Sequence, residues 1–141
     1  MTRDDITALV TRLDAALAAH DVAASTALYA EDCVVESPMG GGTVTGRDAI
    51  ERVQRAFFQA SPDVTFQREA LLVDGHRVAD ISTVTGTDIG GFMGLGPTGK
   101  PFRFSMVRFF TVNDQQIVHE RRIYDFTGLL VQIGMLKAKP A

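Results

Sequence analysis

The richest source of reactive side chains is the segment 117–126, in which most residues are polar or ionisable. If this segment is a strand, alternation divides them between two faces, with His119, Arg121, Ile123 and Asp125 on one and Glu120, Arg122, Tyr124 and Phe126 on the other. A carboxyl such as Asp125, set against apolar side chains, would have its pKa raised toward the range of a general acid or base. The segment therefore indicates acid/base chemistry, or else charges paired across strands on a solvated or dimer-facing surface.

Two more candidates lie outside that segment. Asp88 stands where a predicted strand meets a glycine-rich connection, which suits either a reacting side chain or an Asx turn. Arg103 alternates with the phenylalanines of another predicted strand, so it could bind an anionic ligand oxygen or lie at the surface. By contrast, Asp80 and Asp32 are expected at a strand edge and in a turn.

Several short motifs suggest phosphate binding, metal binding or hydrolysis, but the residues around them do not support these functions. The segment 94–99 matches G-x-G-x-x-G and the opening of a P-loop, but a strand is predicted after it, and Pro101 stands where a P-loop needs Ser or Thr. The histidines lie in three different elements without metal-ligand spacing, and no serine has a G-x-S-x-G setting. We therefore expect no metal and no cofactor.

Composition predicts one soluble globular domain. The chain has 141 residues, a formal charge of −3 and 45% hydrophobic residues, enough for one core. Without a basic block a nucleic-acid partner is not expected, and without an apolar run of about 18 residues neither is a membrane. The lone Cys33, together with an N-terminus unlike a secretory signal, predicts a cytoplasmic protein.

The predicted elements must position these groups. Helical periodicity covers about 2–19 and 47–60, and Asp21 can cap a short helix between them. Strands are predicted at 33–36, 64–73, 77–87, 102–112 and 117–126, and residues 137–141 are expected to fray. This order predicts an α+β fold, in which helices pack on one face of a curved antiparallel sheet and enclose a cone-shaped pocket.

Local motifs along residues 6–134 resemble the nuclear transport factor 2-like superfamily and, within it, the SnoaL-like polyketide cyclases. These motifs are Tyr29-Ala30-Glu31-Asp32, Gly46-Arg47-Asp48-Ala49-Ile50, Gly86-Thr87-Asp88-Ile89-Gly90, Gly96-Pro97-Thr98-Gly99-Lys100 and the segment 125–134, which looks like D-x-x-G-L-L-x-Q-L-G. The resemblance implies a cofactor-independent aldol ring closure with Asp125 as the general acid/base. The chain departs from the cyclases at Asp88, where they usually have His, and at Arg121, where they usually have Trp.

Two other families of the same fold resemble shorter segments. Val35-Glu36-Ser37-Pro38 resembles the V-E-D-P of ketosteroid isomerases, but Ser37 stands in place of their catalytic Asp, so isomerisation by that route is not expected. Limonene epoxide hydrolases resemble residues 97–110, but their W-R-D motif reads Glu120-Arg121-Arg122 here.

Three functions therefore stay open. The first is a cofactor-independent enzyme acting on a hydrophobic, carbonyl-bearing cyclic or polyketide-like molecule; Asp125 would be the acid/base, His119 or Asp88 would assist it, and Arg103 or Arg121 would stabilise an enolate oxygen. Tyr124 and Ser37 complete the candidate substrate-binding residues. The second is a non-catalytic small-molecule-binding module, which an exposed Asp125 would favour. The third is epoxide hydrolysis. We also expect a homodimer formed through the open face of the sheet.

Overall fold

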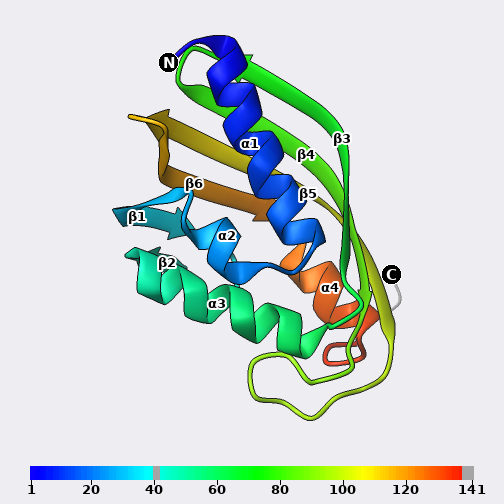
Figure 1. Ribbon diagram of the computed structural model, residues 1–141. Coiled ribbons are helices and arrows are strands. Elements are labelled where there is room, and N and C mark those ends of the chain that lie inside the picture. The colour runs from blue at the N-terminus through cyan, green and yellow to red at the C-terminus, as the bar shows by residue number, and fades with distance from the viewer. Residues whose placement is uncertain (40–41, 138–141) are drawn as a thin grey trace.

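The computed structural model describes residues 1–39 and 42–137, and it confirms the α+β fold (Figure 1). The helices are α1 (Arg3–Ala18), α2 (Val22–Thr26), α3 (Arg47–Ala60) and α4 (Phe126–Gln132). The strands are β1 (Tyr29–Glu36), β2 (Thr43–Thr45), β3 (Thr65–Asp74), β4 (Arg77–Thr87), β5 (Pro101–Asn113) and β6 (Gln116–Tyr124). Most of the tail predicted to fray, residues 138–141, lies outside the described residues.

Helix α1 begins where its sequence predicts. The Thr2 hydroxyl accepts a hydrogen bond from the Asp5 backbone at 3.1 Å, and the Asp5 carboxylate accepts one from the Thr2 backbone at 2.8 Å. One apolar face of the helix is buried against the sheet, through Ile6, Leu9, Val10, Leu13 and Leu17. Each such side chain contributes about 1.5–3 kcal/mol on burial, which holds α1 on the sheet.

Helix α3 starts at a backbone turn that favours glycine. Gly46 has a φ of 93°, a conformation that costs a residue with a side chain more than it costs glycine. The Arg47 guanidinium then donates two hydrogen bonds to the Tyr29 carbonyl, at 3.0 and 2.7 Å, and so ties the start of α3 to β1. This anchoring directs the inner face of α3, including Ile50 and Gln54, toward the sheet.

The six strands form one sheet in the order β2-β1-β6-β5-β4-β3. Strands β3 to β6 make the predicted antiparallel meander, whereas β1 pairs with β6 in parallel, so the sheet as a whole is mixed. Short turns between consecutive strands make the meander antiparallel. Strands β1 and β6 are far apart in the chain, so no turn between them sets their relative direction. Strand β2 was not predicted.

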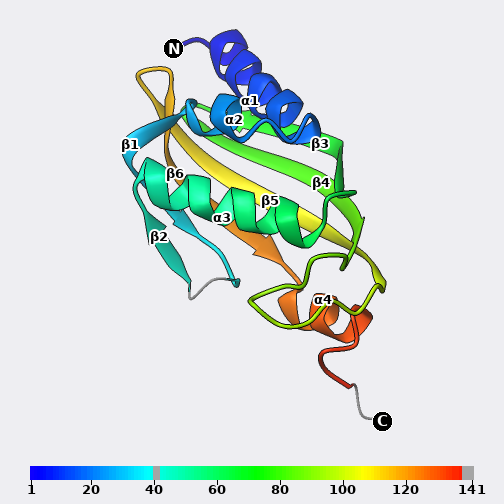
Figure 2. The same cartoon turned by 60° about the horizontal axis from the view of Figure 1, so that its bottom comes forward.

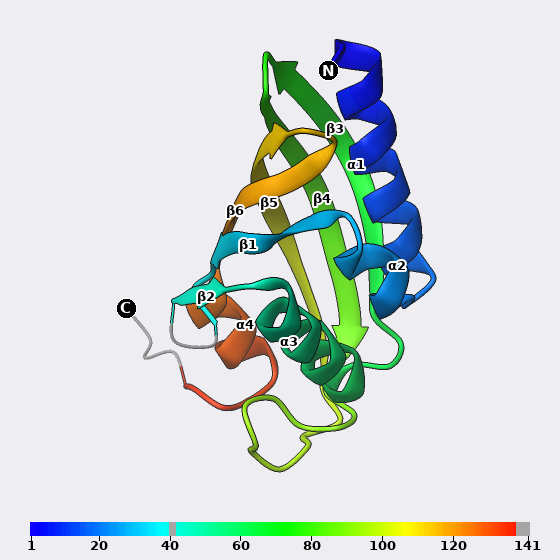
Figure 3. The same cartoon turned by 60° about the vertical axis from the view of Figure 1, so that its left-hand side comes forward.

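The helices gather on one face of this sheet. Helices α1, α2 and α3 lie over the same face, and α4 lies near the end where β6 finishes (Figures 1 and 2). The sheet curves, so that β1 and β2 come round beside α3 (Figure 3). Among the described residues, no helix is both long enough and apolar enough to span a bilayer.

The end of the last strand differs from the prediction. Strand β6 stops at Tyr124, and Asp125 is the N-cap of α4, accepting a hydrogen bond from the Gly128 backbone at 2.8 Å. Leu129 and Ile133 then repeat at helical spacing and are both buried. An N-capping Asp before helically spaced apolar residues is a helix-start signal, and it overrides the strand pattern upstream.

Candidate active site

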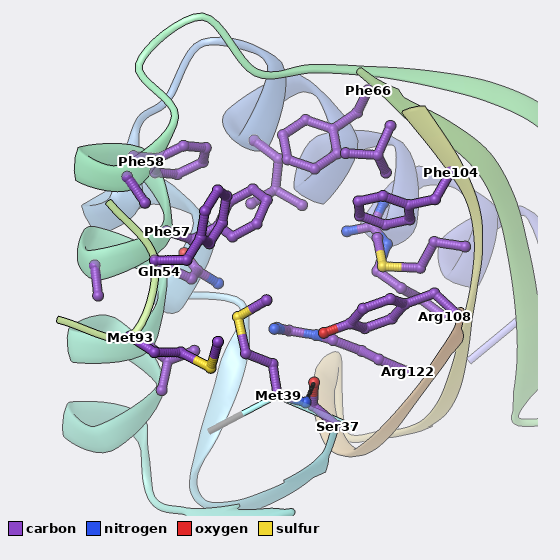
Figure 4. A pocket seen from close by; sticks show the side chains of 18 residues that line it. Ser37, Met39, Gln54, Phe57, Phe58, Phe66, Met93, Phe104, Arg108 and Arg122 are labelled. Carbon is purple, nitrogen blue, oxygen red and sulfur yellow. Dashed lines mark hydrogen bonds between the residues drawn. The ribbon is translucent and has the colours of Figure 1, made fainter. Parts of the chain in front are cut away.

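A cavity of about 250 Å³ lies between α3 and the inner face of the sheet (Figure 4). Most of its lining is apolar, and it includes the phenylalanine and methionine side chains of Phe57, Phe58, Phe66, Phe92, Phe104, Met39, Met93 and Met106. The polar side chains in the lining are few, and they are Ser37, Gln54, Arg108, Arg122 and Tyr124. An apolar space with a few convergent polar groups is the usual form of a small-molecule site.

Strand register explains why β5 and β6 supply the polar groups. Arg108 on β5 lies opposite Arg122 on β6, and Met106 lies opposite Tyr124. Residues opposite one another share a face, and on β5 this is the face of Phe104, whose ring stacks on Tyr124 at a centroid distance of 5.0 Å. The inner face of β6 is therefore the one that carries Glu120, Arg122 and Tyr124.

Arg122 is held in place by a buried carboxylate. Glu120 is fully buried, and it accepts hydrogen bonds from the Nε of Arg122 and from the hydroxyl of Tyr29. Burial alone would lower the pKa of Arg122, but the neighbouring Glu120 carboxylate outweighs it and raises that pKa. Burial, and then Glu120, raise the pKa of Tyr29. Arg122 therefore brings a permanent positive charge to the cavity wall.

Tyr124 lies two residues after Arg122 on β6 and brings a hydroxyl group to the same cavity lining. Burial raises the pKa of Tyr124, while hydrogen bonding to Ser37 and the charge of Arg122 oppose the rise. At neutral pH the hydroxyl keeps its proton and can donate a hydrogen bond. A cationic guanidinium and a phenol on one wall can together stabilise a carbonyl oxygen that is gaining negative charge.

Arg108 reaches the cavity from a second ionic cluster, in which Arg108 and Asp80 are buried and Asp14 and Arg68 are partly exposed. The Arg108 Nη2 donates to Asp14 at 2.6 Å and to Asp80 at 3.1 Å, and Arg68 donates to Asp14 at 2.8 Å. Burial, and then the adjacent Asp14, raise the pKa of Asp80 to about 7, although Arg108 and Arg68 oppose this.

The expectation of Asp80 at a strand edge was wrong, because it is fully buried within β4. Asp32 was expected in a turn, and it lies within β1.

Three of the predicted site residues lie on the other face of β6 or just beyond it. His119 pairs through Nε2 with Glu36 at 2.9 Å, and both side chains are partly exposed. Arg121 is exposed and borders a shallower hollow beside Glu36. Asp125 is exposed, and its carboxylate caps α4. None of the three is among the described residues that line the cavity.

The remaining predictions divide between loop, surface and cavity. Asp88 is fully buried, and it accepts hydrogen bonds from the Gly91 and Thr98 backbones and the Thr98 hydroxyl, at 2.9–3.0 Å, so it organises the loop 88–99. Arg103 is exposed on β5. Tyr124 and Ser37 do line the cavity.

The sequence interpretation missed Gln54 and Arg108 as cavity residues and did not select Arg122. For Arg108 a signal was present, since it has the same alternation as Phe104, Met106 and Phe110 and so had to face the same way. Among the described residues, no group of three or more His, Cys, Asp or Glu side chains is arranged to hold a metal ion.

Comparison with known proteins agrees with this fold. The chain is 26% identical to AclR of Streptomyces galilaeus, described as a candidate hydroxylase, over 99% of this chain and 87% of AclR, with a TM-score of 0.84. IdmH of Streptomyces antibioticus, a candidate polyketide cyclase, is 26% identical over 92% of this chain and 98% of its own, with a TM-score of 0.76. A candidate SnoaL-like polyketide cyclase from Jannaschia sp. CCS1 is 21% identical over 97% and 94%, with a TM-score of 0.85.

A search of curated proteins found no significant match. The sequence model of one family, however, matches residues 7–133, which include every described residue that lines the cavity. The chain therefore belongs to the SnoaL-like polyketide cyclase family.

Proposed function

We propose that the protein is a cofactor-independent acid/base enzyme of the cyclase type, acting on a hydrophobic, carbonyl-bearing cyclic or polyketide-like molecule. The observation that carries the proposal is the pairing of an aromatic cavity with Arg122 and Tyr124 on one wall. The apolar lining would hold the rings, and the two polar groups would bind the carbonyl oxygen. Family membership supports the same reaction class.

In such a reaction an enolate forms on the substrate and then closes a ring. The charge that develops on its oxygen would be stabilised by Arg122, whose position is fixed by Glu120, and by the Tyr124 hydroxyl. The acid/base residue would take the proton from the substrate carbon. The Tyr124 hydroxyl would donate a proton to the alkoxide that ring closure forms, and it would recover that proton from the acid/base residue. Resemblance to the cyclases assigns the acid/base role to Asp125, a role that stays a prediction.

The direct test is a panel of aromatic and polycyclic compounds that carry ketone or 1,3-dicarbonyl groups. Thermal shift would identify those that bind, since binding to the folded state raises the melting temperature, and mass spectrometry would show whether any is converted. Conversion without added metal or cofactor supports the proposal, and conversion that requires either contradicts it.

Tyr124→Phe is expected to lower kcat by about 10²–10³ on any converted compound, because it removes one donor to the developing oxyanion and keeps the ring that stacks on Phe104. Steady-state kinetics would measure this. Tyr29→Phe is the matched control: it removes a hydroxyl that binds Glu120 and is not part of the cavity lining, so kcat should fall much less. Equal losses in the two variants would contradict the role of Tyr124.

Asp125→Asn is expected to remove turnover and to leave the melting temperature almost unchanged. The amide loses the acid/base function but can still cap α4, since Asn and Asp are about equally good N-caps. A single-turnover assay and a thermal melt of the same preparation would measure both. Full turnover in this variant would contradict the acid/base role of Asp125.

A non-catalytic binding module is the second candidate, and the position of Asp125 favours it. That carboxylate is exposed, and no Asp, Glu or His is found among the described residues that line the cavity. This function predicts ligands that raise the melting temperature and are recovered unchanged. The homodimer through the open face of the sheet also stays a prediction, which sedimentation would test.

A further inference from the structure

Gln54 lies in an otherwise apolar part of the cavity, and its side-chain amide has no hydrogen-bond partner in the described part of the chain. It lies on the inner face of α3 and is only 5% exposed. Neither its Nε2 nor its Oε1 has a hydrogen-bond partner among the described residues, although both atoms are buried. Figure 4 shows the side chain pointing into the cavity from α3, with Arg122 entering from the opposite side.

An amide in this position weakens the fold. Leaving a buried donor and a buried acceptor unpaired costs about 1–3 kcal/mol for each group. The rings of Phe57 and Phe58 lie on the same helix and line the same cavity, so an apolar side chain of similar length would suit the surroundings better. The folded chain therefore does not explain the presence of Gln54, whereas a bound molecule with matching groups would.

The chemistry of the amide says what those groups are. A primary amide presents a donor and an acceptor side by side in one plane. Its best complement is another adjacent donor and acceptor, as in a carboxamide, an un-ionised carboxylic acid or a hydroxy ketone. The Arg122 guanidinium has only donors and carries a positive charge, so its complement is an oxygen acceptor.

We propose that Gln54 and Arg122 form two subsites at opposite sides of the cavity, which together select a flat apolar ligand with an adjacent donor and acceptor at one end and a carbonyl or enolate oxygen at the other. The inference rests on the proposed function, since it names the substrate class of that site. It adds Gln54 as the residue that distinguishes this class from simple ketones. Arg122 would bind both this class and simple ketones, because both present an acceptor oxygen.

Two small probes of nearly equal shape separate the Gln54 subsite from the rest of the cavity. Naphthalene-2-carboxamide carries an adjacent donor and acceptor, and 2-acetylnaphthalene replaces the NH₂ group by a methyl group. Titration calorimetry should show the carboxamide binding about tenfold more tightly to the unaltered protein, which corresponds to one recovered hydrogen bond. In Gln54→Met the preference should disappear while the ketone still binds.

The control variant is Val53→Ala, which changes the apolar lining one residue away and should weaken both probes equally. Without ligand, Gln54→Met should melt at the same temperature as the unaltered protein or higher, because it removes two unpaired polar groups. The inference is overturned if Gln54→Met keeps the preference, if it melts lower, or if the unaltered protein fails to bind the carboxamide or to prefer it. A preference for the carboxamide together with no turnover of any compound would sustain the inference and contradict the proposed enzyme.

Discussion

Glu120→Gln is expected to lower the free energy of unfolding by about 3–5 kcal/mol, which is roughly 10–15 °C in melting temperature for a chain of this size. Glu120 is fully buried, and its carboxylate is the counter-charge of Arg122. Glutamine has a similar shape but no charge, so the substitution leaves the guanidinium charged and uncompensated inside the protein. Chemical denaturation at neutral pH would measure the loss.

The chain offers a matched control for that substitution. Glu51 and Arg55 form an ion pair at 2.6 Å on the surface of α3, with side chains 37% and 54% exposed. Glu51→Gln should cost less than about 0.5 kcal/mol, because water solvates the unpaired arginine. If the two variants lost similar free energies of unfolding, the buried Glu120–Arg122 pair would contribute no more than an exposed pair. That result would contradict the role of Glu120 in fixing Arg122 at the cavity wall.

Arg108→Met is expected to cost about 3 kcal/mol near pH 8, because it leaves the buried carboxylate of Asp80 and the partly buried carboxylate of Asp14 with Arg68 as their remaining cation in the cluster. Methionine keeps much of the length and the apolar contact of the side chain, so the lost charge dominates the effect. Denaturation from pH 5 to pH 8 would measure it. The substitution should also change ligand binding, since Arg108 lines the cavity.

The destabilisation by Arg108→Met should shrink as the pH falls. Asp80 has a pKa raised to about 7 in the folded protein, against an ordinary value of 3.8, so the folded state binds a proton more tightly than the unfolded state does. Protonation of Asp80 therefore stabilises the folded state. Its contribution to the free energy of unfolding is complete below about pH 4 and is lost as the pH rises through about 7. Without Arg108 the carboxylate would ionise less readily still. A destabilisation that grew toward pH 5 would contradict this account.

The positions of most elements could be predicted from local patterns. The start of α1, the whole of α3 and the strand 77–87 follow from a capping box, helical periodicity and alternation, all of which are properties of neighbouring residues. The strand predicted at 117–126 ran two residues past the end of β6, because Asp125 begins a helix. The parallel pairing of β1 with β6 depends on residues far apart in the chain, which carry no local signal.

The candidate site was predicted less well than the fold. Alternation correctly divided residues 119–124 into two sets, but it could not say which set faces the helices, so His119 and Arg121 were selected from the outer set and Arg122 was not. For Gln54 a signal was present in its spacing, since it stands four residues after Ile50 and three before Phe57 and so lies on the apolar face of the helix, although its polar side chain by itself indicates exposure. Asp88 was correctly placed at a strand end, and the structure gives its carboxylate three loop hydrogen bonds.

The sequence by itself determined the family, the helices and the antiparallel meander, because each of these depends on local periodicity or contiguous motifs. Only the tertiary structure decided which side chains meet in the cavity. Arg108, Arg122, Tyr124 and Gln54 come from two strands and a helix that are brought together by sheet curvature and by packing of α3. Burial and charge pairing, which control the chemistry of these groups, exist only once those elements have packed.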